Sequence, residues 1–449
     1  MPNKTIKRMA IFMDFTVPIN RREGITAYVG YLMNAILQTY EKAEIEIWLY
    51  SHNEDNFNRE YNDILDKYGN RVFVYNERSA SKEKRIEVVH YIKYQIYKFG
   101  YHICKMLHVK KIEDSFGYRA SFHLGMHNQL LYDLSKAFNS LSEAEIAFVP
   151  FPGLTAALKI NKKVFIQIHD LFTFPLEKLF EKESSPMSSF RKSNKNIKKI
   201  LEQYASRGAV FISSSNYTVK NQVLKYINGT NKRQCKVISF PPMVSNYTGE
   251  TVINEYDFRR KYKIATQYVA FPSQNRPNKN LILLLKALEI LNEDGNDIKL
   301  VTTGKMSHCN STSKFAENDK WHIVIELNDL NLDELFCLYK YAELIVCPNI
   351  IEGLGISGQC LEGLAIGKPV IHAKSMGIED SLSSVGLDMN TAKLQWVDLD
   401  DPVGLAERIR YVLTHKEEVI EEQRDVLTAY TKKTWDDVSR EYMEVFANN

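Results

Sequence analysis

The chain has 449 residues, which is more than one hydrophobic core usually supports, so two domains of about 200 residues each are expected. The apolar fraction of 44% and the charged fraction of 25% match ordinary folded proteins and exclude a wholly disordered or fibrous chain. The net charge of +3 is unevenly distributed, because residues 1–200 hold 30 Lys/Arg against 22 Asp/Glu (+8) and the remainder holds 28 against 33 (−5).

The basic first half suits a membrane surface or an anionic substrate. No helix-turn-helix, zinc-finger or aromatic RNA-binding pattern supports nucleic acid as a partner. Only a short apolar run precedes Asp14, which is too short for a signal peptide or a membrane span. The six cysteines are widely spaced and show no metal-ligand or C-x-x-C pattern. We therefore expect a cytoplasmic protein with buried thiols.

Short apolar runs alternate with longer helical patterns along the chain, which is typical of parallel sheets with helices on both faces. In the first half, the predicted strands are residues 9–13, 45–49, 72–75, 146–149, 164–168, 210–212 and 237–240. In the second half they are residues 268–271, 299–303, 322–325, 344–347 and 369–371. The sequence therefore predicts two doubly wound α/β sheets.

One segment between the third and fourth predicted strands differs from the rest. From Lys82 to Lys111, apolar residues at a 3–4–4–3–4 spacing form one helical stripe flanked by lysines and tyrosines. Such a basic amphipathic helix can rest on an anionic membrane, or its stripe can pack against its own domain. A second basic stretch, residues 191–199, is predicted to be a solvated loop.

The domain boundary is predicted near Pro241 and Pro242, because proline can continue neither a central strand nor a helix. Residues 1–240 then form the first domain and residues 241–430 the second. Residues 431–449 remain as a terminal helix.

A glycine-spaced loop follows the predicted strand 344–347. Gly353 and Gly355 lie in this loop, and a helix starts near Ser357. Glycines let backbone amides approach a ligand closely, and a helix start directs its free N–H groups at an anion. The loop can therefore bind a phosphate.

Two glutamates bracket this loop, with Glu352 before it and Glu362 within the following helix. Glu362 could accept hydrogen bonds from a ribose diol, and Glu352 could bind the hydroxyls of a sugar attached to the same diphosphate. Together they indicate a nucleotide-sugar site. The alternative is an ordinary strand–loop–helix unit with surface glutamates.

At these residues the sequence resembles glycosyltransferase family 4, which comprises retaining enzymes of the GT-B fold. The shared elements are Glu352-Gly353-Leu354-Gly355, Glu362 and Gly367-Lys368-Pro369-Val370-Ile371. Nine residues separate the two glutamates, where the family usually has seven. The resemblance implies two Rossmann-like domains facing each other across a cleft, the first binding the acceptor and the second the nucleotide sugar.

The resemblance also assigns roles elsewhere in the second domain. Lys279 and Arg276 would neutralise the donor diphosphate, although either could be an exposed loop cation. The residues expected to bind the donor are Gly24, Gly304, Gly353, Leu354, Gly355, Ile356, Ser357 and Glu362. Residues 431–446 look like the helix that crosses back to the first domain in GT-B enzymes.

In the first domain, Gly24 opens a helix as the family's glycine-rich segment does, although plain helix initiation would look the same. His169 and Asp170 resemble the family's His-Asp pair at a strand end, where open α/β sheets bind ligands; a buried structural histidine is the alternative. His169 would position the sugar together with Glu352. The stretch from Phe211 to Thr218 resembles the family's serine-bearing strand-to-helix junction.

We therefore expect a retaining glycosyltransferase that moves a hexose from a nucleotide diphosphate sugar to a glycan or lipid-linked glycan, in bacterial surface polysaccharide synthesis. The His-Asp pair favours GDP-mannose. No Asp-x-Asp motif follows a donor strand, so no divalent metal and no other cofactor is expected. The helix from Lys82 to Lys111 would hold the protein at the inner face of the cell membrane. The alternative is a non-catalytic GT-B protein that binds nucleotide sugar or acts as a scaffold.

Overall fold

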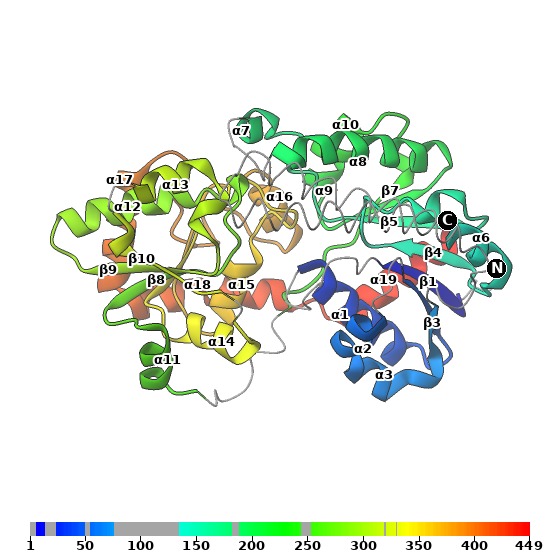
Figure 1. Cartoon of the computed structure of the whole chain (residues 1–449), viewed down its shortest axis with the longest axis horizontal. Coiled ribbons are helices and arrows are strands. Elements are labelled where there is room, and N and C mark those ends of the chain that lie inside the picture. Colours follow the sequence, from blue (N-terminus) through cyan, green and yellow to red (C-terminus); the bar gives the residue numbers. More distant parts are fainter. Residues whose placement is uncertain are drawn as a thin grey trace, which may run out of the picture.

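The computed structural model describes residues 6–13, 24–49, 54–75, 134–181, 188–243, 253–317, 320–328 and 330–449. These residues build two parallel α/β domains that lie side by side (Figure 1). The basic helix expected over residues 82–111 lies outside the described residues. Within the described ranges, no helix combines the length and the apolar character needed to cross a membrane.

A parallel sheet with the strand order β3-β2-β1-β4-β5-β6-β7 forms the centre of the first domain. Its strands are β1 (Arg8–Met13), β2 (Glu44–Leu49), β3 (Val72–Tyr75), β4 (Ile146–Val149), β5 (Lys163–Ile168), β6 (Val210–Ser213) and β7 (Cys235–Val237). All residues of β4 and β6 are buried, because helices cover both faces of the sheet.

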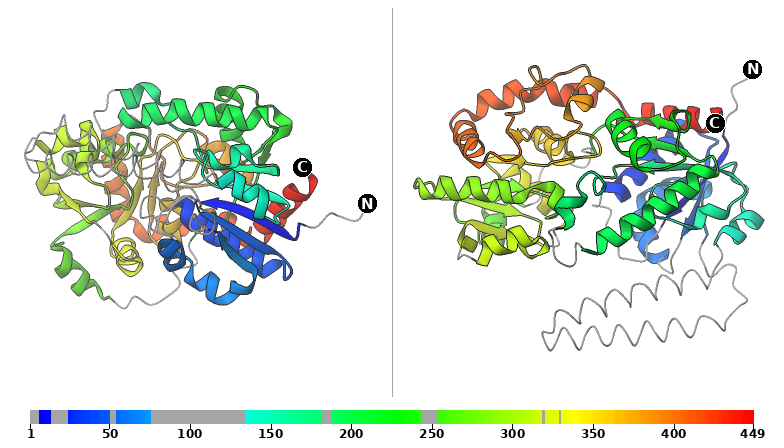
Figure 2. Two further views of the ribbon diagram at one scale, coloured as in Figure 1. Left: turned by 45° about the vertical axis from the view of Figure 1, so that its right-hand side comes forward. Right: turned by 90° about the horizontal axis from the view of Figure 1, so that it is seen from above.

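The helices of the first domain pack on these two faces, and Figure 2 shows them from two further directions. They are α1 (Gly24–Thr39), α2 (Glu54–Glu60), α3 (Asn62–Tyr68), α6 (Leu134–Leu141), α7 (Glu177–Glu181), α8 (Ser188–Ser206), α9 (Asn216–Thr218) and α10 (Leu224–Tyr226). One core joins α1 to the sheet and a second joins α6 and α8 to its other face. Alternate residues of β1 enter different cores, as Ile11 and Phe12 do.

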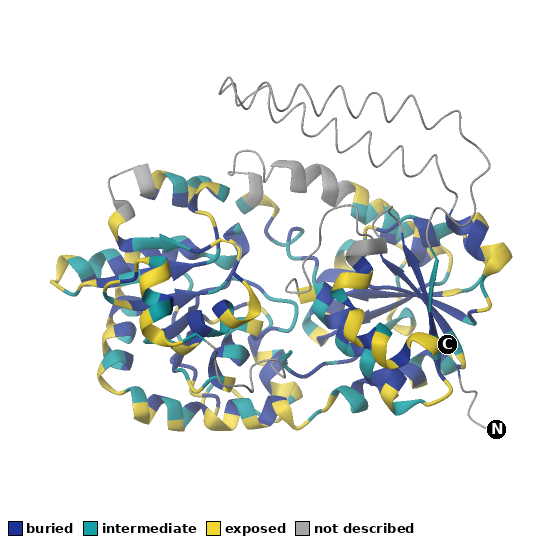
Figure 3. Ribbon diagram, turned by 60° about the horizontal axis from the view of Figure 1, so that its bottom comes forward, coloured by how far each residue is buried: buried dark blue, intermediate teal, exposed yellow. Residues whose placement is uncertain are grey.

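The second domain repeats the pattern with the strand order β10-β9-β8-β11-β12. Its strands are β8 (Gln267–Phe271), β9 (Ile298–Thr302), β10 (Val324–Glu326), β11 (Leu344–Cys347) and β12 (Val370–His372). Its helices are α11 (Glu255–Tyr262), α12 (Leu281–Glu293), α13 (Asn310–Glu317), α14 (Leu332–Lys340), α15 (Gly358–Ala365), α16 (Ile378–Ser384), α17 (Pro402–Thr414) and α18 (Lys416–Thr431). Buried residues lie at the centre of both domains (Figure 3).

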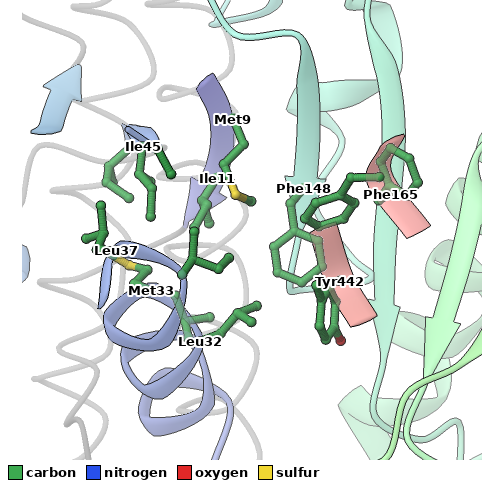
Figure 4. Close-up of a cluster of buried hydrophobic side chains, with 14 of the residues drawn as sticks. Met9, Ile11, Leu32, Met33, Leu37, Ile45, Phe148, Phe165 and Tyr442 are labelled. Atoms are coloured by element: carbon green, nitrogen blue, oxygen red, sulfur yellow. The ribbon is translucent and has the colours of Figure 1, made fainter. Parts of the chain in front are cut away.

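The last helix, α19 (Trp435–Asn448), belongs to the first domain's core although it follows the second domain in sequence. Val438, Tyr442, Met443 and Phe446 are buried there against α1 and the sheet. Figure 4 shows Tyr442 beside Phe148 of β4. The chain therefore passes between the domains twice.

The structure confirms two doubly wound α/β sheets and corrects two local predictions. Residues 191–199, predicted to be a loop, lie in α8, because Ile197, Ile200 and Leu201 supply an apolar stripe between the lysines. The strand predicted over residues 237–240 is instead β7, Cys235–Val237. Residues Ile238 and Phe240 leave the sheet edge and fill the core beneath α1.

Both sheets reverse their strand order at one place, between β1 and β4 and between β8 and β11. Open α/β sheets bind ligands at the carboxyl ends of strands next to such a reversal. In the second domain the rule points to the loops after β8 and β11, and in the first domain the loop after β5 follows the strand next to β4.

Candidate active site

A partly buried ion pair joins the loops that follow β8 and β11. Lys279 lies at the end of a short 3-10 helix, Pro277–Lys279, and its ammonium group contacts the carboxylate of Glu352. The two side chains are only 13% and 14% exposed. The Ile350 N–H donates to the Asn278 carbonyl oxygen at 2.8 Å, which ties the two loops together. The pair is thus fixed by backbone contacts as well as by charge.

The helix that follows the Glu352 loop has a well-defined start. Ser357 caps α15, since its hydroxyl accepts the Cys360 N–H at 3.2 Å. The Ser357 N–H in turn donates to His372 Nε2 at 3.2 Å, while His372 Nδ1 contacts the Ala373 carbonyl oxygen at 2.7 Å. Burial lowers the pKa of His372 to about 4, which keeps this ring neutral and able to accept. His372 therefore orients the start of α15.

Gly355 is required by the geometry of this loop. Its φ of +82° is a left-handed conformation, and a Cβ there would lie 2.5 Å from the Gly377 carbonyl oxygen and from Ser381 Cβ. The side chain of Ile356 is fully buried in the second domain's core, and Leu354 packs against the cores of both domains. Only the backbone of Ile356 can therefore face a ligand.

Glu362 lies in α15 and accepts a hydrogen bond from the Tyr339 hydroxyl. Burial raises the pKa of Glu362 to about 7, although the hydrogen bond and the charge of Lys279 act in the opposite direction. A carboxylate poised near neutral pH can accept hydrogen bonds from a diol when it is ionised.

The first domain contributes His169 and Asp170 at the end of β5. The His169 ring meets Tyr28 edge-on, with centroids 4.9 Å apart, and burial lowers its pKa to about 4. Its Nε2 atom is buried and has no hydrogen-bond partner among the described residues. Burial and the charge of Glu352 raise the pKa of Asp170 to about 6, against the opposing charges of Lys279 and Arg276. Charged groups of the second domain therefore act on a carboxylate of the first.

Gly353 lies at a close contact between the two domains. A Cβ at this position would collide with the carbonyl oxygen of His169, and it would lie 3.4 Å from Asp170 Cβ. Glycine is thus needed for the loop after β11 to approach the end of β5.

The structure brings together most of the predicted residues. His169, Lys279, Glu352 and the start of α15 surround one region between the domains, with Arg276 close enough to influence Asp170. Gly304 lies against the β8 loop that carries Arg276 and Lys279, where a Cβ would be 2.5 Å from the Asn275 nitrogen. Gly24 begins α1, and the residues just before it lie outside the described part.

Two site residues, Tyr339 and His372, were not predicted. Tyr339 lies in α14, far from Glu362 in sequence, and nothing in a helical pattern marks its hydroxyl. His372 is the last residue of a buried apolar strand. A polar residue at the carboxyl end of such a strand is a sequence feature that could have indicated a site residue.

The five cysteines in the described ranges form no disulfide, and four of them are buried. Across those same ranges, no group of three or more His, Cys, Asp or Glu residues could hold a metal ion.

Residues 254–434 match the family model described as Glycosyl transferases group 1. We call these residues the group 1 domain because they match that model. An uncharacterized glycosyltransferase of Methanocaldococcus jannaschii is 32% identical over 133 residues, which are 28% of this chain. The alignment spans 30% of that relative, less than a third of its length.

Solved structures contain both domains of this chain in the same arrangement of folds. Anabaena HepE in complex with UDP and glucose has a TM-score of 0.60 at 11% identity, covering 99% of this chain and 100% of that one. Sucrose-phosphate synthase from Thermosynechococcus elongatus has a TM-score of 0.62 at 12% identity, with the same coverage. The chain therefore has the GT-B fold.

Proposed function

We propose that the protein is a glycosyltransferase that moves a hexose from a nucleotide diphosphate sugar to an acceptor hydroxyl. The observation that carries the proposal is the convergence of the Lys279–Glu352 pair and the capped start of α15 with His169 and Asp170 of the other domain. The group 1 domain supports the reaction class, and a protein of the same fold binds UDP and glucose.

In this proposal, cations and helix N–H groups bind the donor diphosphate. The free N–H groups at the start of α15 favour an anion, and Lys279 and Arg276 add positive charge beside it. Lys279 is paired with Glu352 in the structure, so an arriving phosphate competes for the ammonium group. The Glu352 carboxylate released in this way becomes available to the hydroxyls of the sugar.

Glu362 and His169 supply the remaining donor contacts. An ionised Glu362 accepts hydrogen bonds from the ribose diol, and Tyr339 holds its other side. The buried, unpartnered Nε2 of His169 is an unsatisfied polar atom beside the site, and a sugar hydroxyl would satisfy it.

We further propose that the transfer retains the configuration of the sugar, as in glycosyltransferase family 4. The bond between the anomeric carbon and the diphosphate oxygen breaks, and the acceptor oxygen bonds to the same face of an oxocarbenium-like sugar. The acceptor proton leaves toward the departing phosphate oxygen. The protein's task is to stabilise the leaving charge and to align both substrates in a site from which the closed domains exclude water. No divalent metal is required in this scheme.

The donor and acceptor are proposed from the sequence. The His169-Asp170 pair favours GDP-mannose, and the basic first half favours a glycan or lipid-linked glycan presented at the inner face of the membrane in surface polysaccharide synthesis. The experiment is a thermal-shift screen with UDP-, GDP-, ADP- and dTDP-sugars, followed by detection of the released nucleoside diphosphate and a glycosylated acceptor. If none of these nucleotide sugars raises the melting temperature, the proposal is refuted.

A non-catalytic nucleotide-sugar-binding or scaffold protein is the second candidate. The nine-residue spacing between Glu352 and Glu362 favours it, because family 4 usually has seven. The two candidates separate cleanly, since the second predicts a thermal shift with a nucleotide sugar but neither hydrolysis nor transfer.

A further inference from the structure

The residues on both sides of Glu352 are held by the first domain. After it, the Gly353 carbonyl oxygen accepts hydrogen bonds from the Ser214 hydroxyl at 3.1 Å and from the Thr218 hydroxyl at 3.5 Å. Before it, Ile351 is fully buried in a small apolar cluster with Leu176 of the first domain. The first domain therefore adds its own contacts to those that already fix the Glu352 loop within the second domain.

A second contact links the same first-domain segment to α16. The Tyr217 N–H donates to Asp380 Oδ2 at 2.9 Å, and the Tyr217 ring lies against Gly377, whose φ is +86°. A Cβ at Gly377 would be 2.8 Å from this ring. Ser215 stabilises the segment from within, because its hydroxyl accepts the Thr218 N–H at 3.2 Å.

We propose that Ser214, Tyr217, Thr218 and Asp380 form an interdomain clamp that positions Glu352 for the donor sugar. Ser214 and Thr218 act through the Gly353 carbonyl oxygen, and Tyr217 acts through Asp380 of α16. Contacts within the second domain hold the Glu352 loop near its place, and domain closure then completes the placement of the sugar-binding carboxylate. The inference rests on the proposed function for the role of Glu352, but the contacts themselves do not.

The surroundings of the clamp allow it to open. A cavity of about 260 Å³ lies beside it and is lined by both domains, including Ser214, Leu354 and Asp380. Water in this cavity can replace the clamp's hydrogen bonds as the domains separate, which keeps the cost of opening small.

The test compares Asp380→Ala, Asp380→Asn and the double variant Ser214→Ala/Thr218→Val with wild type. Glu379→Ala is the matched control, because Glu379 is exposed and lies in the same first turn of α16. We expect Asp380→Ala and the double variant to raise the donor KM about tenfold. Each change removes a hydrogen bond that exists only in the closed state, so it shifts the equilibrium toward the open state, which binds the donor more weakly. Asp380→Asn keeps an acceptor oxygen and should restore most of the affinity.

A structural role alone would lower the melting temperature and the active fraction without changing the donor KM. Wild-type KM in both clamp variants, or an equal rise in Glu379→Ala, would overturn the clamp. Hydrogen exchange gives a readout that needs no activity: the amides of residues 353–355 should exchange faster in Asp380→Ala than in Glu379→Ala. Equal exchange would overturn the clamp, whereas absence of turnover in wild type would overturn only the proposed function.

Discussion

The Glu362→Gln variant removes a carboxylate whose pKa is raised by burial to about 7 from an ordinary value of 4.5. In the unfolded chain Glu362 ionises near its ordinary pKa of 4.5, whereas in the folded protein it stays protonated until the pH approaches 7. The wild type therefore loses stability as the pH rises through this window, and the neutral glutamine variant does not.

The difference between these two pKa values corresponds to about 3 kcal/mol at pH 8. This is an upper bound, because the Glu362 side chain is partly exposed and solvent screens the effect. A gain of about 1–3 kcal/mol would raise the melting temperature of a domain of this size by several degrees, at about 2–4 °C per kcal/mol. At pH 5 the gain should be less than about 1 kcal/mol.

The assay is thermal unfolding followed by circular dichroism at pH 8 and pH 5, together with donor binding. Glu362→Gln should melt higher than wild type at pH 8 yet bind the donor at least about tenfold more weakly, since an amide replaces the charged acceptor for the ribose diol. In the wild type, donor binding should strengthen as the pH rises through about 7. Glu407→Gln, on the exposed side of α17, should change neither property. An equal or lower melting temperature for Glu362→Gln at pH 8 would refute the reasoning.

Four other outcomes follow from the structure. Lys279→Ala should lower kcat/KM by at least about 100-fold, while Lys286→Ala on the exposed side of α12 should not; equal turnover of the two would count against the phosphate role. Gly353→Ala places a methyl group against the His169 carbonyl oxygen, so small-angle scattering should show a larger radius of gyration and activity should fall with little change in melting temperature. Turnover should survive EDTA, and loss that magnesium restores would contradict the proposed metal independence. Phe446→Ala should destabilise the first domain by about 3–5 kcal/mol in denaturant titration, because the ring is buried in that core.

The strands could be predicted because parallel strands covered on both faces are short, continuous apolar runs. The predicted bounds of β3, β4 and β11 are those observed. The helix α8 was missed because its polar face carries a dense run of lysines, which conceals an apolar stripe of few residues. The position of β7 was missed because this edge strand contains Lys236 and is only partly buried, whereas the apolar run after it fills a core.

The candidate site was predictable where one loop carries the chemistry, as from Glu352 to Ser357. Contacts between distant residues were not. Nothing in the sequence pairs Lys279 with Glu352, places Tyr339 against Glu362 or brings Ser214 to Gly353, because each contact depends on how two sheets and two domains pack. Spacing along a chain reports periodicity within one element, and it carries no information on packing between elements.

The position of α19 has a consequence for synthesis. Domains generally fold in the order in which the ribosome releases them, the N-terminal one first. Here the first domain's core includes Tyr442 and Phe446, which are made only after the whole of residues 254–434. The group 1 domain can thus complete its core before the domain that precedes it. Until α19 leaves the ribosome, the newly made first domain has an exposed apolar groove in the place of that helix. A chain truncated near residue 430 would leave that groove open for good and should aggregate.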